Sequence, residues 1–294
     1  MFVQTNTVKS IKSYFTTKLS DRFSENEIKI IGNEAICNRL GLTSNDLIGI
    51  NDQLLSESDL LYFRSVVKRL LNNEPFQYVI GSSFFFGLEL KSDARALIPR
   101  PETEELVDWV RESFSTDFSG KMLDLCTGSG CIALALKSIF FNAKISGSDL
   151  SQDALMLAKE NAIKTSLDVD FIQFDANMEQ QYELLLNESA ELFDCWVSNP
   201  PYIPLSDTSE MAENVLDFEP HMALFVENHD PLLFYQSISK MAMKFLKPKG
   251  LLFFEIHENL SDEVKNVLEI EGFSSIEIRK DLQGKSRMVK AEKM

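Results

Sequence analysis

The tetrapeptide Asn199-Pro200-Pro201-Tyr202 carries groups that can hold a nitrogen atom in place for reaction. The side-chain oxygen of Asn199 and the main-chain oxygen of Pro200 can each accept one N–H of a planar amide or aromatic amine. Two acceptors fix the nitrogen and can turn its lone pair toward an electrophile, while the two prolines keep the segment stiff. The ring of Tyr202 can stack on a flat substrate group. The tetrapeptide predicts group transfer to an amide or amine nitrogen; the alternative is a proline turn that only closes a strand.

A second segment, Asp124-Leu125-Cys126-Thr127-Gly128-Ser129-Gly130, lies where a strand is expected to end and a helix to begin. Glycines at such a place let a ligand approach the backbone closely. Asp149 ends the next predicted strand, where a carboxylate can hydrogen-bond ribose hydroxyls. This pattern alone fits an NAD site as well as an S-adenosylmethionine (SAM) site, but Ala133 replaces the third glycine of the NAD fingerprint. The sequence therefore favours a SAM site built on this turn and Asp149, and the alternative is a plain tight turn with a carboxylate at a helix start.

The segment Asp175-Ala176-Asn177 follows the third predicted strand. Ligands of open α/β sheets lie at the carboxyl ends of the strands, so a residue here can reach the adenine amino group. An ordinary loop is the alternative. Ala176 and Asn199 complete the predicted cofactor contacts.

Strands and helices alternate from residue 121 onward, and this alternation positions all three segments. Repeated βα units predict a mostly parallel sheet with helices on both faces. Two consecutive strands at the end of the chain predict an antiparallel hairpin at one edge. The predicted strands are 122–126, 144–149, 169–174, 193–198, 250–256, 274–279 and 287–291; the helices between them are 131–140, 152–164, 232–245 and 261–270.

The first part of the chain reads as helical. Ser24 and Glu27 have the spacing of a capping box, and Ser56 is a second expected helix start. Residues 1–73 are therefore predicted to form a small helical bundle. Residues 74–98, rich in aromatic and β-branched types, are expected to form a β-hairpin or linker, and residues 99–294 the catalytic α/β domain.

Composition narrows the function classes. The chain has 294 residues, 29 Lys and Arg against 45 Asp and Glu, and a formal net charge of −16, so a general nucleic-acid binder is disfavoured. The four cysteines form no Cys-x-x-Cys pair and the three histidines are scattered, so no metal site is predicted. No signal-peptide apolar region opens the sequence and no apolar run nears the roughly 18 residues of a membrane span. A cytoplasmic protein with reduced thiols is expected.

Several ordered segments are shared with one known family. The chain resembles the release-factor glutamine N5-methyltransferases (PrmC/HemK) from about residue 74 to the end. The Pro-Arg-Pro-Glu-Thr-Glu block discriminates most, because many nitrogen methyltransferases share Asn-Pro-Pro-Tyr but far fewer share both. The matching segments are 74–81 (EPFQYVIG), 97–107 (LIPRPETEELV), 124–130 (DLCTGSG), 197–204 (VSNPPYIP) and 281–287 (DLQGKSR).

The resemblance implies a seven-stranded Rossmann-like SAM methyltransferase sheet behind a helical N-terminal domain that docks release factors. It implies methyl transfer from SAM, leaving S-adenosylhomocysteine, to the side-chain amide of the glutamine in the Gly-Gly-Gln loop of peptide chain release factors. By position, 126–130 and Asp149 contact SAM, 199–202 hold the amide, and 100–103 lie near the site. The chain departs from the family at Cys126, commonly Gly, at Ala176, often aromatic or larger, and at His257, usually Gly. A strand-end surface histidine is the simplest interpretation of His257.

Two other functions remain open at this point. Adenine N6 is also a nitrogen on an sp² carbon, so a DNA or RNA adenine-N6 methyltransferase would use the same tetrapeptide. The acidic charge and the lack of a long target-recognition insert argue against it. A non-catalytic SAM-binding module is the second alternative, and the intact Asn199 argues against that one.

Overall fold

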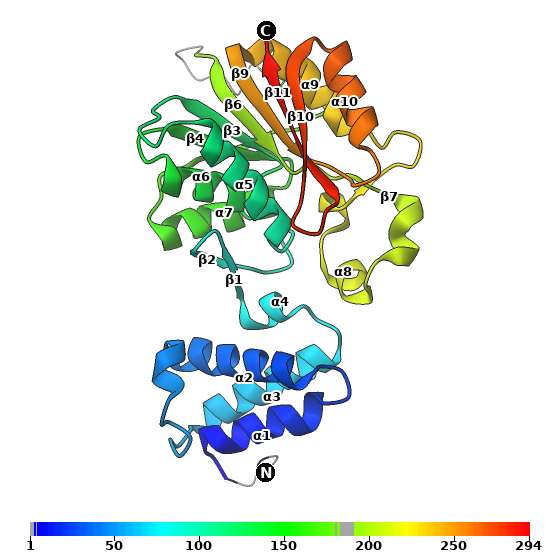
Figure 1. The fold of residues 1–294 in the computed structure, drawn as a ribbon. Helices are drawn as coiled ribbons and strands as arrows, with labels where there is room; N and C mark the ends of the chain where they lie inside the picture. Colours follow the sequence, from blue (N-terminus) through cyan, green and yellow to red (C-terminus); the bar gives the residue numbers. More distant parts are fainter. Residues whose placement is uncertain (1–2, 4, 180, 183–190) are drawn as a thin grey trace. The chain divides into compact units, whose positions relative to one another are not determined.

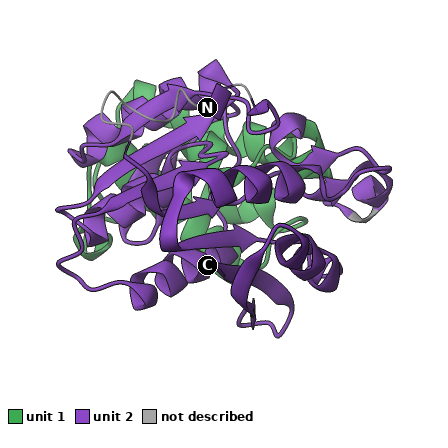
Figure 2. Ribbon diagram, turned by 90° about the horizontal axis from the view of Figure 1, so that it is seen from above, with its two compact units in different colours: residues 1–81, 213–218 green, residues 82–212, 219–294 purple. Residues whose placement is uncertain are grey.

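A computed structural model describes residues 3, 5–179, 181–182 and 191–294 of the chain. The chain divides into two compact units, coloured separately in Figure 2: residues 1–81 with 213–218, and residues 82–212 with 219–294. The helical unit therefore extends several residues beyond the expected boundary at residue 73 and takes in a short segment from the second half of the chain.

The first unit is a small bundle of helices. As predicted, Ser24 and Glu27 form a capping box at the start of α2. Ser56 starts α3 as expected, and the structure shows that it forms a capping box with Asp59. The apolar faces of α1 to α3 meet in one core, in which the rings of Phe15 and Phe63 pack edge to face. The elements are α1 (Val8–Leu19), α2 (Glu25–Leu40), η1 (Ser44–Leu47), α3 (Glu57–Leu71), α4 (Phe76–Ile80) and α8 (Glu213–Phe218).

The segment 74–98 differs in part from the expected β structure. Residues 76–80 form the single-turn helix α4, because the φ of −55° at Pro75 suits a helix start and Gly81, at φ 81°, ends it in the left-handed region. The aromatic and β-branched composition of this segment did not indicate the short helix α4. The expected hairpin lies just after it, as β1 (Ser82–Phe85) paired antiparallel with β2 (Leu88–Lys91).

The second unit is built on a seven-stranded sheet with the order β10-β11-β9-β6-β3-β4-β5 (Figure 1). Strands β9, β6, β3, β4 and β5 run parallel, and β11 pairs antiparallel with both β9 and β10. The predicted mostly parallel sheet with a terminal antiparallel hairpin is confirmed. The strands are β3 (Lys121–Leu125), β4 (Lys144–Asp149), β5 (Asp170–Gln173), β6 (Phe193–Ser198), β9 (Leu246–Glu255), β10 (Phe273–Lys280) and β11 (Ser286–Lys293).

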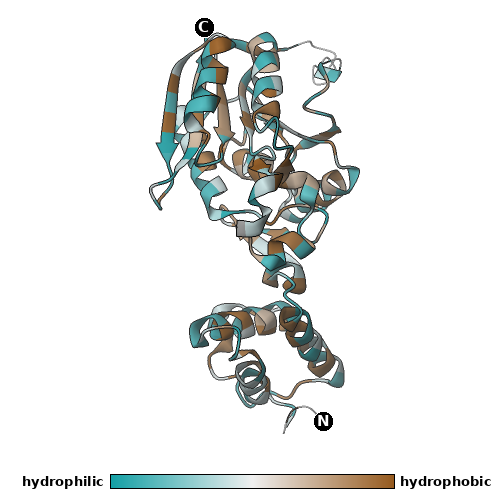
Figure 3. Ribbon diagram, turned by 90° about the vertical axis from the view of Figure 1, so that its right-hand side faces the viewer, coloured by the Kyte–Doolittle hydropathy of each residue, from teal (hydrophilic) through white to brown (hydrophobic). Residues whose placement is uncertain are grey.

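Helices cover both faces of this sheet, and strand residues alternate between the two cores. Trp196 of β6 packs with α9 and α10 on one face, while its neighbours Cys195 and Val197 pack with α5 and α6 on the other. Hydrophobic colour accordingly gathers on the strands and the helix sides that meet them (Figure 3). The helices are α5 (Pro101–Ser113), α6 (Cys131–Ile139), α7 (Gln152–Thr165), α9 (Leu233–Phe245) and α10 (Ser261–Ile270).

The strand order reverses direction at β3, because the chain goes from β3 to β4 and β5 on one side and to β6 on the other. In open α/β sheets this reversal leaves a crevice at the carboxyl ends of the strands, where ligands bind. A further feature lies between β6 and α9. There β7 (Ile203–Pro204) pairs parallel with β8 (Phe225–Val226), with the turns η3 (Leu205–Glu210) and η4 (His221–Ala223) nearby.

Candidate functional site

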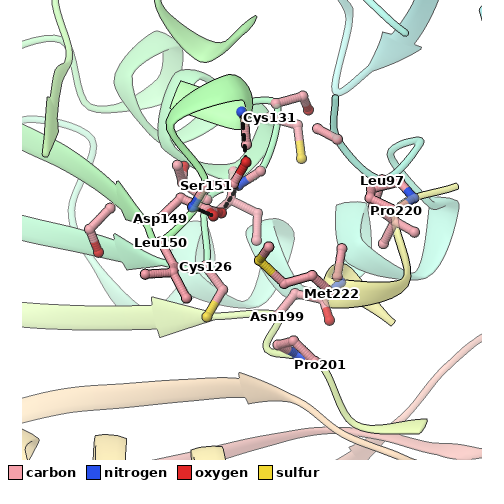
Figure 4. Close-up of a pocket in the computed structure, with 18 of the residues that line it drawn as sticks. Leu97, Cys126, Cys131, Asp149, Leu150, Ser151, Asn199, Pro201, Pro220 and Met222 are labelled. Atoms are coloured by element: carbon pink, nitrogen blue, oxygen red, sulfur yellow. Dashed lines mark hydrogen bonds between the residues drawn. The ribbon is translucent and has the colours of Figure 1, made fainter. Parts of the chain in front are cut away.

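A pocket opens at the carboxyl ends of β3, β4 and β6, where the strand order reverses. Figure 4 shows Cys126 and Asp149 on one side of it, Leu97, Pro220 and Met222 on another, and Asn199 between them. The pocket lies wholly within the second compact unit. Its lining combines residues 95–100 and 103, the turn 126–129, the β4 end 148–151, residues 174–177, and residues 199 and 201, together with Cys131, Ile132, Ala154, Pro220, Met222, Ala223 and Phe234.

The turn after β3 has an unusual backbone. Cys126, Gly128 and Gly130 have φ values of 60°, 55° and 82°. A left-handed conformation costs an ordinary residue about 1 kcal/mol, so glycine suits two of these positions and Cys126 adopts it against that cost. At Gly130 a Cβ atom would also lie 3.1 Å from the Cβ of Ala158 and from a ring carbon of Phe171, closer than ordinary packing. The turn therefore brings the backbone of 126–129 to the pocket surface.

Asp124 holds this turn from inside. Its Oδ2 accepts hydrogen bonds from the Thr127 hydroxyl at 2.5 Å and from the main-chain N–H of Ala133 at 3.1 Å. The carboxyl group is fully buried, and desolvation raises its pKa to about 7 against the lowering effect of those two bonds. Asp124 is therefore a structural support of the turn and does not line the pocket.

Asp149 lies at the end of β4 and lines the pocket. Its Oδ2 accepts from the Gly128 N–H and its Oδ1 from the Ser151 N–H, both at 2.9 Å. A carboxylate oxygen can accept more than one hydrogen bond, so both oxygens of Asp149 keep capacity for a ligand. Burial raises the pKa of Asp149, while the main-chain N–H donors oppose that change. This arrangement presents a fixed pair of acceptors, which suits two neighbouring hydroxyl groups.

Asn199 lies at the end of β6, and a chain of side-chain hydrogen bonds fixes it. Its Nδ2 donates to the Oγ1 of Thr103 at 3.2 Å, and the Thr103 hydroxyl donates to Oε2 of Glu255 at 2.6 Å. The hydroxyl of Tyr202 donates to the other Glu255 oxygen at 3.0 Å. Glu255 is 2% exposed, and burial raises its pKa, opposed by these two donors and by the charge of Arg287. Thr103, Glu255 and Tyr202 thus join Asn199 in one chain of hydrogen bonds that fixes its amide.

A buried ion pair supports the side of the pocket formed by Pro220, Met222 and Ala223. Glu219 accepts from Arg100 Nη2 at 2.5 Å and from the Ile98 N–H at 3.1 Å. Its side chain is 1% exposed. These contacts fasten the segment after α8 to the segment before α5, so two loops far apart in sequence form one wall.

Most of the predicted site residues line the pocket, and three do not. Gly130 closes the turn behind it, Pro200 is not part of its lining, and Tyr202 has its hydroxyl bonded to Glu255, so its stacking on a substrate stays a prediction. The structure brings the others together: Cys126, Thr127, Gly128, Ser129, Asp149, Ala176, Asn199 and Pro201.

Sequence reasoning missed two residues of this site. The sequence assigns no role to Glu255, although a carboxylate that ends an apolar strand indicates a special position. Glu219 carried no signal, since Glu-Pro is ordinary loop sequence. Arg100 and Thr103, expected near the site from the family resemblance, both line the pocket.

The thiols of Cys126 and Cys131, which line the pocket, are held in the protonated form. Burial holds the pKa of the Cys126 thiol well above its usual value and raises that of Cys131 to about 12. Within the described ranges no group of three His, Cys, Asp or Glu side chains is arranged to hold a metal ion. The same ranges contain no helix long and apolar enough to cross a membrane. What the pocket does offer is a set of fixed hydrogen-bond acceptors, which positions ligands for a direct displacement.

Two family models match the chain. Residues 106–217 match the methyltransferase small domain, and residues 17–81 match the PrmC N-terminal domain. The first match includes the turn after β3, Asp149 and the Asn-Pro-Pro-Tyr segment.

Named relatives match over nearly the whole chain. The release factor glutamine methyltransferase of Flavobacterium psychrophilum is 38% identical over 286 residues, 96% of this chain and 98% of that protein. The protein of the same name from Bacteroides thetaiotaomicron is 33% identical over 283 residues, 96% of this chain and 99% of that protein. Among solved structures, a methyltransferase from Pyrococcus furiosus has a TM-score of 0.51 at 17% identity, over 77% of this chain and 96% of that chain. That structural likeness shows a shared fold.

Proposed function

The chain belongs to the family of release factor glutamine methyltransferases, and we propose that it methylates the side-chain amide nitrogen of the glutamine in the Gly-Gly-Gln loop of peptide chain release factors. SAM is the methyl donor of this family and fold. The observation that carries the proposal is the fixed amide of Asn199 at the pocket beside the turn 126–129. Methyl transfer needs the cofactor and the substrate in one cavity, and the turn 126–129 and Asn199 offer a feature suited to each.

The cofactor side of the pocket fits SAM in two respects. The carboxylate of Asp149 keeps two acceptors directed by main-chain N–H groups, which suits the ribose hydroxyls of an adenosine. Leu150 and Phe174 line the pocket near it with apolar surface, and Ala176 adds to that surface. Such a lining suits a flat adenine ring and an uncharged sugar. We assign cofactor contacts to Cys126, Thr127, Gly128, Ser129, Asp149, Ala176 and Asn199, with Gly130 shaping the turn.

The substrate side fits a glutamine amide. When bound, SAM supplies a methyl group on a cationic sulfur, which leaves as the carbon–sulfur bond breaks and the nitrogen–carbon bond forms. The Oδ1 of Asn199 and the carbonyl of Pro200 each accept one N–H of the glutamine amide, so its lone pair faces the methyl group. Pro201 and Tyr202 complete the stiff segment that holds these acceptors. The proton leaves after the nitrogen has gained positive charge, so no general base has to act first.

The first compact unit is proposed to dock the release factor. Its support is the match of residues 17–81 to the PrmC N-terminal domain and the separate helical core of that unit. Because release factors work on the ribosome, we place the activity in the cytoplasm. The catalytic domain is proposed to begin at about residue 99 and to continue to the end of the chain.

Methylation of adenine N6 is the competing activity, because the same acceptors would hold an aromatic amine. The name shared by the relatives favours glutamine. The net charge of −16 also disfavours a nucleic-acid duplex as a partner.

Methyl transfer from labelled SAM to purified release factor tests the proposal. Two controls run beside it: a release factor whose Gly-Gly-Gln glutamine is replaced by alanine, and a duplex DNA. Label on the unmodified release factor alone is the expected result. Label on DNA alone would move the function to adenine methylation, and label on neither would leave only membership of the fold and family.

A further inference from the structure

The side chain of Asn199 presents two different groups, an accepting oxygen and a donating NH2, which exchange places when the amide rotates. The proposed function, on which this inference rests, requires the oxygen to face the substrate nitrogen. Nothing in the Asn-Pro-Pro-Tyr segment itself decides which group faces the pocket. We propose that Thr103 and Glu255 are positioning residues that fix this choice through one directed relay of hydrogen bonds.

Thr103 forms the first step of the relay. It is the third residue of α5, 2% exposed, and its Oγ1 lies 3.2 Å from Nδ2 of Asn199. A hydroxyl has one hydrogen to donate. If that hydrogen is committed elsewhere, Oγ1 can only accept from Asn199, and the NH2 end of the amide must face Thr103.

Glu255 commits that hydrogen. Its Oε2 lies 2.6 Å from Oγ1 of Thr103, a length typical of a hydroxyl donating to a carboxylate. An ionised carboxylate can only accept, so the direction of this bond is set. The second oxygen, Oε1, likewise accepts from the hydroxyl of Tyr202 at 3.0 Å. Both oxygens of Glu255 therefore receive hydrogens, and neither can supply one to Thr103.

Both oxygens of Glu255 accept from hydroxyl groups, Oε2 from Thr103 and Oε1 from Tyr202, as an ionised carboxylate does. Burial raises the pKa of Glu255, and these two donors and the charge of Arg287, on β11, oppose that rise. Arg287 is itself held by Asp281 at 3.3 Å and by the main-chain oxygen of Ile256 at 3.4 Å. The loop between β10 and β11, part of the segment shared with the family, thus helps to hold Arg287 in place through Asp281.

The relay runs in one direction from Asn199 to Glu255. The amide donates to Thr103, Thr103 donates to the carboxylate, and Oδ1 of Asn199 stays available at the pocket. Neither Thr103 nor Glu255 has to touch the glutamine to act. Their effect is on how often Asn199 presents an acceptor, so it belongs in the chemical step and not in SAM binding.

A pair of substitutions at Thr103 tests the relay. Thr103→Val keeps the shape of the side chain and removes the hydroxyl, while Thr103→Ser keeps the hydroxyl. For transfer to release factor at saturating SAM, we expect Thr103→Val to lower kcat about 10- to 100-fold, because the amide is no longer held in one orientation. We expect Thr103→Ser to stay within about threefold of the parent chain, and the Kd for SAM to be unchanged in both.

A second variant tests the direction of the relay. In Glu255→Gln the carboxylate becomes an amide whose NH2 group donates, so it can no longer accept from both Thr103 and Tyr202. Where the NH2 faces Thr103, the hydroxyl turns its hydrogen to Asn199 and the acceptor rotates away from the pocket. The expected result is a loss of kcat at least as large as for Thr103→Val, with SAM affinity kept within about threefold.

The outcomes separate this inference from the proposed function. If the parent chain does not methylate the Gly-Gly-Gln glutamine, the proposed function fails and the relay has no role to play. If the parent methylates it and Thr103→Val turns over as fast, the relay is wrong while the function stands. Equal losses in Thr103→Val and Thr103→Ser would also overturn it, because packing and not the hydroxyl would then be responsible.

Discussion

The two halves of the pocket are held together in different ways. The cofactor half is the turn 126–130 together with Asp149, where SAM is proposed to bind. The hydrogen bonds that fix this half join residues close in sequence: Thr127 to Asp124 over 3 residues, Ala133 to Asp124 over 9, and Gly128 to Asp149 over 21. The nitrogen half is Asn199 with Thr103 and Glu255, where the substrate nitrogen is proposed to bind. Here the hydrogen bond from Asn199 to Thr103 spans 96 residues, and the one from Thr103 to Glu255 spans 152. One half is built by neighbouring residues of the chain, and the other only by the closed fold.

This difference has a consequence for function. A local turn keeps its shape when distant contacts are disturbed, whereas a relay across three segments depends on each of them. Substitutions on the cofactor half are therefore expected to change SAM affinity, and substitutions on the nitrogen half to change the chemical step. Substitutions in each half test whether SAM affinity and the rate of the chemical step change separately.

The largest effect is expected for Asn199→Ala. Loss of one of two acceptors that position the nitrogen should lower kcat about 100- to 1000-fold, comparable to removal of a group that stabilises a transition state. The Kd for SAM, measured by calorimetry, should rise by less than about threefold, because Asn199 is one of seven assigned cofactor contacts and the other six remain. A thermal melt of the variant checks that the fold is intact, and near-normal turnover would contradict the role of Asn199.

Asp149→Ala should act on the other half. It removes two acceptors for the ribose, so the Kd for SAM is expected to rise about 10- to 100-fold. At saturating SAM, kcat should stay within about threefold of the parent chain. Asp153→Ala, an exposed acid on α7 outside the pocket lining, is the matched control and should leave both constants unchanged. Unchanged SAM affinity in Asp149→Ala would mean that the ribose lies elsewhere.

Asp124→Asn should change the pH dependence of stability. Burial raises the pKa of Asp124 to about 7, whereas the unfolded chain has a pKa of about 4 at this group. Between those values the folded protein keeps a proton that the unfolded chain has lost, so this contribution to the free energy of unfolding falls as pH rises, and it is constant above pH 7.

Asn at position 124 does not titrate, so the difference between the two proteins should grow in that window. Between pH 5 and pH 8 this difference should shift by about 3 kcal/mol in favour of Asp124→Asn, from about 1.4 kcal/mol for each of the roughly two pH units below pH 7. Thermal or urea unfolding of both proteins from pH 5 to pH 8 without SAM measures it. A difference that is constant across this range would show that Asp124 is ionised throughout.

The smallest effect is expected for His257→Ala. His257 follows Glu255 by two residues, accepts from the Asn259 N–H at 3.2 Å, and has its Nε2 3.8 Å from Asp207. His257 does not line the pocket, and its ring packs edge to face on the ring of Tyr202, at 6.1 Å between centroids. Steady-state kcat and the KM for SAM should both stay within about twofold of the parent values. A larger loss of kcat would extend the nitrogen half to this histidine.

The same contrast explains which features the sequence could predict. The strand 144–149 was predicted with the bounds of β4, and the capping box at Ser24 and the helix start at Ser56 were predicted from short local patterns. Such signals are local: hydrophobic periodicity and side chains that bond the nearest N–H. The turn 126–130 and Asp149 belong to this class, and they proved to be neighbours in the structure.

Features set by distant contacts escaped prediction. The pair β7 and β8 has two residues in each strand, too few to show a period, and α4 is a single turn in an aromatic stretch. The role of Glu255 depends on Thr103 and Tyr202, which only the folded sheet brings to it. Sequence alone therefore pointed to Asn199, the acceptor proposed for the substrate nitrogen, but not to the residues that hold its amide.

A single-turnover measurement tests the separation of the two halves most directly. The rate of label transfer to release factor would be followed at rising SAM concentration for the parent chain, Asp149→Ala and Asn199→Ala. We expect Asp149→Ala to need more SAM but to reach nearly the parent rate, and Asn199→Ala to saturate at the parent SAM concentration with a rate lower by two orders of magnitude or more. Equal losses of the saturated rate in both variants would contradict the account.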